Sequence, residues 1–248
     1  MAADPPPRAG SGHGARTKLL DTAEALIADV GLGAVSLRQI GREAGQRNTG
    51  AVRYHFGTLD DLVDAILARH LPSLDTTRNA LLDQLELDGG GALRGYAAAL
   101  VQPLGSAMAT RSGRHFLALA AQLVNHPSQR GVERLAPEGG SLLRWRAAVE
   151  PLLPEGAVEL HSRFNAIHFA HTEMARRAAR PSSERIRLLI TSRTADLVAA
   201  VLATPLTEPT RRLLERSTDE DSEPLAGTTG PARSAPTRRP TRSRRAPG

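Results

Sequence analysis

Apolar residues recur every three or four positions through most of the chain between residues 15 and 203. This spacing gives a helix one apolar face, whereas a half-buried strand would alternate apolar and polar residues, and no segment does so. Together with local start and stop signals, the pattern predicts an all-α protein. The predicted helices cover approximately residues 15–30, 36–44, 50–57, 59–70, 93–109, 112–124, 142–153, 154–180 and 183–203.

Capping signals delimit the short helices near the N-terminus. Ser36 is a good N-cap, and Gln39 stands at the capping-box position three residues later. Gly45 is a typical helix terminator. Thr58 repeats the N-cap signal for the next helix, which we expect to end near residue 70 because Pro72 cannot donate a backbone hydrogen bond.

Prolines also shape the predictions for the second half of the chain. Pro103 lies inside the 93–109 segment and should kink or split that helix. Pro154 fits the first position of a long helix that has acids near its start and arginines at its end, as the helix dipole favours. Residues 127–140 carry a mixed pattern, for which we expect a short helix and a loop.

Changes in composition divide the chain into segments. The first residues are rich in Pro and Gly, and beyond Thr204 the chain is rich in Thr, Pro, Ser and charge, with six arginines and no acid between Arg233 and Arg245. Such segments bury too little apolar area to offset the entropy of ordering. The predicted organisation is a disordered arm at 1–13, a helix-turn-helix domain at 14–58, a helical effector-binding and dimerisation domain at 59–204 with a linker helix at 59–71, and a disordered Arg-rich tail at 205–248.

Composition narrows the class of protein. The net charge of +6 favours an anionic partner, although arginine dominates the basic residues everywhere, as a GC-rich genome would also produce. The absence of cysteine excludes disulfides, thiolate metal sites and cysteine nucleophiles. No apolar run approaches a membrane span of about 18 residues, and the N-terminus has no apolar signal core, so we expect a soluble cytoplasmic protein.

The region from Ser36 to Leu62 is the most informative part of the chain. Two short helices joined by a glycine turn, with a surplus of hydrogen-bond donors, form a unit that reads a major groove. The start of the second helix meets base edges in such units, so Arg47 and Arg53 are the favoured contacts; solvation of a turn is the alternative. The candidate DNA-binding residues are Arg38, Arg47, Asn48, Thr49, Arg53, Tyr54 and His55.

The region around residues 15–70 resembles the TetR family of transcriptional regulators, most sharply from Gly50 to Gly57 (GAVRYHFG). The resemblance implies a three-helix DNA-binding domain before an all-helical domain that binds ligand and dimerises, with Tyr54 and His55 as the phosphate-binding pair. Two departures stand out. The turn from Gly45 to Gly50 is one residue longer than the commonest family turn, and Leu59 stands where the family often has a phosphate-binding Lys. Other family-like residues are Ala23, Gly31, Ser36, Ile40, Ala44 and Leu62.

The second half of the chain offers candidate pocket residues and a candidate dimer interface. Aromatic side chains are scarce there and favour ligand cavities, although core packing is an equal alternative. The candidate ligand pocket consists of Tyr96, Phe116, Trp145, Phe164 and His168. The resemblance implies that the last two long helices form a four-helix bundle between two subunits, with apolar stripes at Phe164, Ile167, Met174, Ile186, Ile190, Leu197 and Val201.

A metal site is the weaker interpretation of the same region. His161, His168, His171 and Glu173 have spacings that can bring imidazoles to one helical face, but they match no metalloenzyme motif. We therefore predict no catalytic residue, no metal and no cofactor. The predicted function is a homodimeric repressor that binds a palindromic site on double-stranded DNA and is released by a small-molecule effector. The alternatives are a ligand-independent DNA-binding regulator and a small histidine-based metalloprotein.

Overall fold

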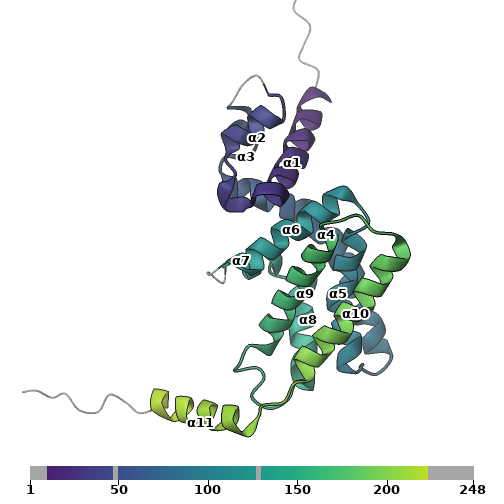
Figure 1. The fold of residues 1–248 in the computed structure, drawn as a ribbon, viewed down its shortest axis with the longest axis vertical. Coiled ribbons are helices and arrows are strands. Elements are labelled where there is room, and N and C mark those ends of the chain that lie inside the picture. Colours follow the sequence, from purple (N-terminus) through teal and green to yellow (C-terminus); the bar gives the residue numbers. More distant parts are fainter. Residues whose placement is uncertain (1–9, 47–49, 127–129, 223–248) are drawn as a thin grey trace, which may run out of the picture. The chain divides into compact units, whose positions relative to one another are not determined.

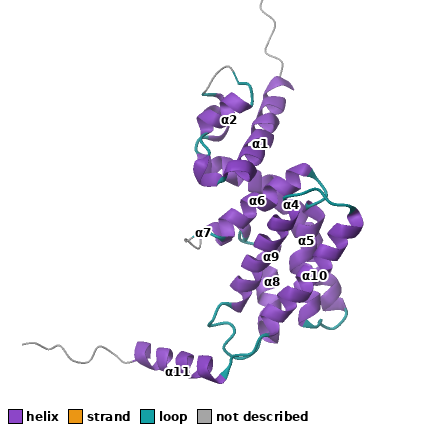
Figure 2. Ribbon diagram, in the orientation of Figure 1, coloured by secondary structure: helices purple, strands orange, loops and turns teal. Residues whose placement is uncertain are grey.

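The computed structural model describes residues 10–46, 50–126 and 130–222, and the regular elements in these ranges are all helical (Figures 1 and 2). The predicted all-α fold is therefore confirmed. The described residues divide into two units, one that ends at Leu206 and one that begins at Thr207. The first unit contains α1 (Gly10–Val30), α2 (Leu37–Glu43), α3 (Ala51–Phe56), α4 (Leu59–Leu87), α5 (Leu93–Ala107), α6 (Arg111–Val124), α7 (Arg130–Leu135), α8 (Ser141–Val149), α9 (Ser162–Ala178) and α10 (Glu184–Ala203), with two short 3-10 turns at Leu32–Ala34 and Glu150–Leu152.

The N-terminal helices α1, α2 and α3 pack around one small apolar core. Its fully buried side chains are Leu19, Ala23, Ile27, Ile40 and Val52. Helix α1 begins at Gly10, five residues before the predicted start, so the arm expected to be disordered is helical from residue 10. Each added residue of an established helix gains a hydrogen bond, and the packed part of α1 therefore extends into a glycine-rich stretch.

Helix α4 is much longer than the predicted linker helix. It runs through Pro72 to Leu87 instead of ending near residue 71. The hydroxyl of Ser73 donates to the carbonyl of His70 at 2.9 Å, and the missing proline donor breaks only one rung of the helix. Leu74 and Leu82 continue the buried stripe beyond the proline, so packing offsets that loss. Helix α5 likewise passes through Pro103, which is itself buried, without splitting.

The long helix that we predicted to begin at Pro154 does not form over its first two turns. Helix α9 begins only at Ser162, because Gly156 and His161 adopt left-handed backbone conformations with φ of 74° and 57°. A left-handed residue cannot continue a right-handed helix. Helix α10 matches the prediction closely and begins with the Ser183 hydroxyl accepting from the backbone N–H of Ile186.

The core of the helical domain lies between α4, α5, α6, α8, α9 and α10. Helix α10 packs against α5 and α9, while α6 packs against α9 and α1 (Figure 1). Trp145 and Phe116 are completely buried in this core. Helix α6 therefore touches both the C-terminal helices and the first helix of the chain.

The second unit contains α11 (Glu208–Ser222), where we predicted disorder. The disorder predicted beyond residue 205 is therefore wrong for residues 208–222. Arg212 donates to the carboxylate of Glu208 one turn earlier at 2.9 Å, and such pairs stabilise a charged helix that has no extensive apolar face. The arginine-rich residues from 223 onward lie outside the described part of the chain.

Candidate nucleic-acid interface

Short-range hydrogen bonds fix both ends of the helix-turn-helix. The hydroxyl of Ser36 accepts from the backbone N–H of Gln39 at 3.2 Å and starts α2. Gly45 ends it with φ of 70°, a conformation that glycine adopts without strain. Thr58 and Asp61 form a complete capping box at the start of α4, and the hydrogen bonds from Thr58 hold the pKa of Asp61 below its usual value. The predicted N-caps at Ser36 and Thr58 are therefore confirmed, and a complete capping box is described at Thr58 but not at Ser36, where only the bond from the Gln39 backbone is described.

Helix α3 separates its buried residues from its basic ones. Val52 and Phe56 point into the core and are 0% and 7% exposed. Arg53, the next residue after Val52, is exposed, and Arg38 on α2 is exposed as well. The guanidinium of Arg16 lies 5.0 Å from the centre of the Phe56 ring, a cation–π contact that ties α1 to α3. Exposed donors thus surround a rigidly packed helix.

Tyr54 and His55 lie side by side on α3, with their ring centres 5.4 Å apart in an edge-to-face arrangement. Tyr54 is 87% exposed, so its hydroxyl is accessible and its ring is not packed against α1. His55 is half-buried. Arg47, Asn48 and Thr49 lie outside the described residues, and their predicted role in reading bases remains a prediction.

The predicted pocket residues do not line a shared cavity among the two clefts described for this structure. The indole N–H of Trp145 donates to the carbonyl of Tyr96 at 2.7 Å, and Phe116 stacks on His70 with ring centres 4.6 Å apart. Phe164 is 37% exposed and lies near His168 on the outer side of α9. Three of the five residues are thus core, which is the alternative that the sequence left open.

The four residues of the metal alternative are not brought together. His171 is buried, its Nδ1 bonds the carbonyl of Ile167 at 2.8 Å, and burial lowers its pKa to about 4. Glu173 is paired with Arg176 and Arg177, which lower its pKa. Within the described ranges, no three His, Asp or Glu side chains form a group suited to a metal ion.

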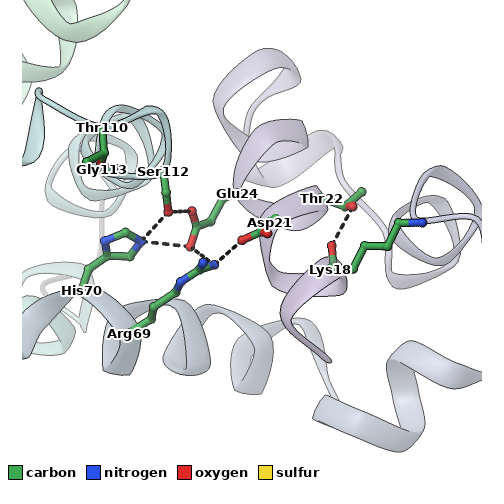
Figure 3. A network of polar contacts seen from close by, with 9 residues as sticks. All are labelled: Lys18, Asp21, Thr22, Glu24, Arg69, His70, Thr110, Ser112 and Gly113. Atoms are coloured by element: carbon green, nitrogen blue, oxygen red, sulfur yellow. Dashed lines mark hydrogen bonds and ion pairs between the residues drawn. The ribbon is translucent and has the colours of Figure 1, made fainter. Parts of the chain in front are cut away.

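The structure adds a polar network that the sequence analysis missed. Glu24 of α1 is only 1% exposed and accepts from Ser112 of α6 and from Arg69 of α4, and it contacts His70 of α4 (Figure 3). Arg69 also pairs with Asp21 at 2.5 Å. One signal was present in the sequence, because Glu24 occupies an apolar position in the stripe of α1.

Two further contacts join the helix-turn-helix to the helices that follow it. Gln122 of α6 accepts from the backbone N–H of Leu32 at 2.6 Å and donates to the carbonyl of Ile27, so it caps the end of α1. Arg134 of α7 binds Asp60 and Asp64 in the first turns of α4, directly after α3. The DNA-binding helices are therefore fastened to the helical domain by side chains of α4, α6 and α7.

The N-terminal sequence and the fold of the chain are similar to those of known proteins. The sequence profile of bacterial regulatory proteins of the tetR family matches residues 19–66. The crystal structure of AmtR from Mycobacterium smegmatis is similar, with a TM-score of 0.50, 18% identity, and coverage of 80% of this chain and 90% of AmtR. HlyIIR, a hemolysin II transcriptional regulator, has a TM-score of 0.49 and 15% identity, over 78% of this chain and 99% of its own.

At these identities the structural likeness concerns the fold alone. No curated protein sequence matches the chain. No helix in the described ranges is both long and apolar enough to cross a membrane. The tetR family profile matches the segment from α1 to the first part of α4, and these helices build a helix-turn-helix, so residues 19–66 form a DNA-binding domain of the kind found in TetR-family transcriptional regulators.

Proposed function

We propose that the protein is a homodimeric repressor that binds a palindromic operator and is released by a small-molecule effector. The observation that carries the proposal is the two-sided helix α3, which buries Val52 and Phe56 and presents Arg53 and Tyr54 to solvent. A short, firmly packed helix with exposed donors is what major-groove recognition requires. Repression is the usual action in this family, and no catalytic role is part of the proposal.

The proposed DNA contacts divide into two kinds. Arg47, Asn48 and Thr49 precede α3 and, with Arg53, are proposed to meet base edges. Arginine suits guanine and asparagine suits adenine in the major groove. Tyr54, His55 and Arg38 are proposed to bind phosphates, which position the helix without reading sequence.

A second copy of the chain is the proposed partner along α10. Ile186 and Leu189 are 45% and 65% exposed, and they fall on one face with Arg193 and Leu197. Exposed apolar side chains in such a stripe favour association. Ile167 and Met174, which we assigned to this interface, are instead buried within the subunit. The proposed interface therefore uses the outer face of α10 together with Phe164.

A ligand-independent regulator is the second candidate. Phe116 and Trp145 are 0% exposed and packed against neighbouring groups, so these predicted pocket residues offer no open ligand site. This observation favours a purely structural helical core. An effector that binds elsewhere, at the junction between α1 and α6, would decide against the second candidate.

DNA selection with the purified protein tests the proposal. We expect enrichment of an inverted repeat whose half-sites are centred about one helical turn, or a multiple of it, apart. Enrichment of a single half-site would contradict dimeric binding. Failure to enrich any sequence above the input library would contradict the proposed function as a whole.

A further inference from the structure

A cleft of about 980 Å³ lies between α1, α6 and the C-terminal end of α9. Helix α1 contributes Lys18, Asp21 and Ala25, and α6 contributes Arg111 and His115. The volume is at the upper end of the range for small-molecule sites. The cleft is separate from the predicted pocket residues of the core, and one of its walls is a helix of the DNA-binding domain.

Three of the four carboxylates that line the cleft have an arginine partner, although two of them share one guanidinium. Asp21 and Glu24 both pair with Arg69, and Glu43 pairs with Arg42 at 3.3 Å. Asp29 is the remaining acid of the lining. The cleft therefore presents less negative charge than its composition suggests.

The cations on α6 are not neutralised in this way. Arg111 and Arg114 line the cleft. Among the described residues, neither guanidinium forms an ion pair with a carboxylate within 4.0 Å. Residues 111, 114, 115 and 118 share one face of a helix, so both guanidiniums border the same space. Burial is the main cause that lowers the pKa of His115; the positive charges of Arg111 and Arg114 act in the same direction, and the carboxylate of Glu24 acts in the opposite one.

The rest of the lining is small and apolar. Ala118 of α6 and Ala175, Ala178 and Ala179 at the end of α9 contribute methyl groups and leave space above them. Apolar walls with a few placed charged groups are typical of sites for organic ligands. An arginine pair suits a carboxylate or a phosphate because the planar guanidinium donates two parallel hydrogen bonds.

We propose that this cleft binds a small organic anion, a carboxylate or a phosphate monoester, through Arg111 and Arg114. The bound anion acts as the effector, a role that rests on the proposed function. Its carbon skeleton lies over the alanines of α6 and α9. One wall of the cleft, α1, belongs to the DNA-binding domain. Ligand binding in the cleft therefore affects the placement of α3.

The coupling follows from what surrounds the cleft. Ser112 lies between Arg111 and Arg114 in sequence and bonds the buried carboxylate of Glu24 on α1. An anion that draws Arg111 and Arg114 toward it shifts the helix that carries Ser112. A ligand changes DNA affinity only when it binds the two arrangements of the domains with different affinity. The short Ser112–Glu24 bond makes α1 sensitive to such a shift.

Calorimetry on the full chain at constant ionic strength tests the site. The probes are phenyl phosphate, benzoate and the uncharged benzamide. The test variant is Arg111→Gln/Arg114→Gln, and the matched control is Arg185→Gln/Arg216→Gln, which removes two exposed arginines outside the cleft. We expect saturable binding of at least one anion, no binding of benzamide, and a loss of at least about tenfold in affinity only in the test variant.

Three outcomes overturn the site: no saturable binding of either anion, equal binding of benzamide, or an undiminished affinity in a test variant that melts like the wild type. If the test variant melts early, the single variants Arg111→Gln and Arg114→Gln replace it and must each weaken binding. Preference for one of the two anions identifies the class of effector.

A parallel titration on the selected DNA separates this inference from the proposed function. Anion binding that leaves DNA affinity unchanged preserves the site and refutes its role as an effector site. A wild-type protein that selects no DNA refutes the proposed function, whatever the anions do. If the anions lower the DNA affinity of the wild-type protein but not that of the test variant, the effector site and the proposed function are both supported.

Discussion

The hydroxyl of Ser112 donates to a carboxylate oxygen of Glu24 at 2.5 Å, across a junction between helices that are 88 residues apart in the chain. Gln122, ten residues further along α6, holds the other end of the contact with α1. At a rise of about 1.5 Å per residue these two attachments lie about 15 Å apart. Helix α6 therefore holds α1 at two points, which favours joint movement of the two helices.

Loss of the Ser112 hydroxyl should weaken this junction. Ser112→Ala leaves the buried Glu24 carboxylate with one donor fewer, and we expect a loss of about 1–3 kcal/mol in unfolding free energy, since a bond to a charged group is removed. Chemical denaturation measures the loss. The control is Ser106→Ala, whose hydroxyl bonds only a carbonyl of its own helix on the surface. Equal stability of the two variants would show that the contact contributes nothing.

The buried imidazole of His171 should make stability depend on pH. Burial lowers its pKa to about 4 in the folded protein from an ordinary value of 6.5. The unfolded chain then binds a proton more readily than the folded one. The resulting stability is fully present above pH 6.5 and is lost as the pH falls from 6.5 toward 4.

The size of this effect is about 3 kcal/mol, since each unit of pKa difference corresponds to about 1.4 kcal/mol. Denaturation of wild type and His171→Gln between pH 7 and pH 4 should show a shallower pH dependence in the variant. His161→Asn is the control, because His161 is exposed and asparagine tolerates its left-handed backbone. Parallel curves for wild type and His171→Gln would contradict the assignment.

A charge on the outer face of α10 should separate the proposed dimer. Leu189 is 65% exposed in the subunit, so Leu189→Glu is tolerated by the fold but places an unpaired charge in the interface. Leu213→Glu is the matched control, since Leu213 is 63% exposed on α11. Sedimentation should give a monomer for Leu189→Glu and a dimer for Leu213→Glu. A dimeric Leu189→Glu protein would move the interface elsewhere.

The clamp at the start of α4 should matter for DNA binding without touching DNA. Arg134 binds the carboxylate of Asp64 and both the carboxylate and carbonyl of Asp60, two residues after the Thr58 cap. Arg134→Met releases α7 from the helix that follows α3. We expect a several-fold weaker affinity for operator DNA with an unchanged salt slope, because no phosphate contact is lost. A changed slope would instead indicate direct contact with DNA.

Local signals in the sequence carried most of the successful predictions. Ser36 and Thr58 cap their helices through neighbours three residues away, so a short window contains the whole interaction. By contrast, Glu24 finds its partners 46 and 88 residues away, and no local pattern specifies such partners.

The failures have equally specific causes. Pro72 lacks a donor, but the buried Leu74 and Leu82 beyond it hold α4 together, and this packing is not readable before the fold is known. His161 has a positive φ although it is not a glycine, so its residue type did not predict that the helix is interrupted before α9. The aromatic residues Phe116 and Trp145 filled the core rather than lining a pocket, since both uses favour the same side chains.

The central claim is that α3 reads DNA through its exposed face. The measurement is the affinity of wild type and Arg53→Ala for the selected palindrome and for a scrambled duplex, across a salt titration, with Arg212→Ala on α11 as the control. We expect Arg53→Ala to lose about 1–3 kcal/mol on the palindrome, and less on the scrambled duplex, if it contacts a base. A phosphate contact would instead lower both affinities and reduce the salt slope by about one. An Arg53→Ala protein that binds both duplexes like the wild type at every salt concentration would contradict the account.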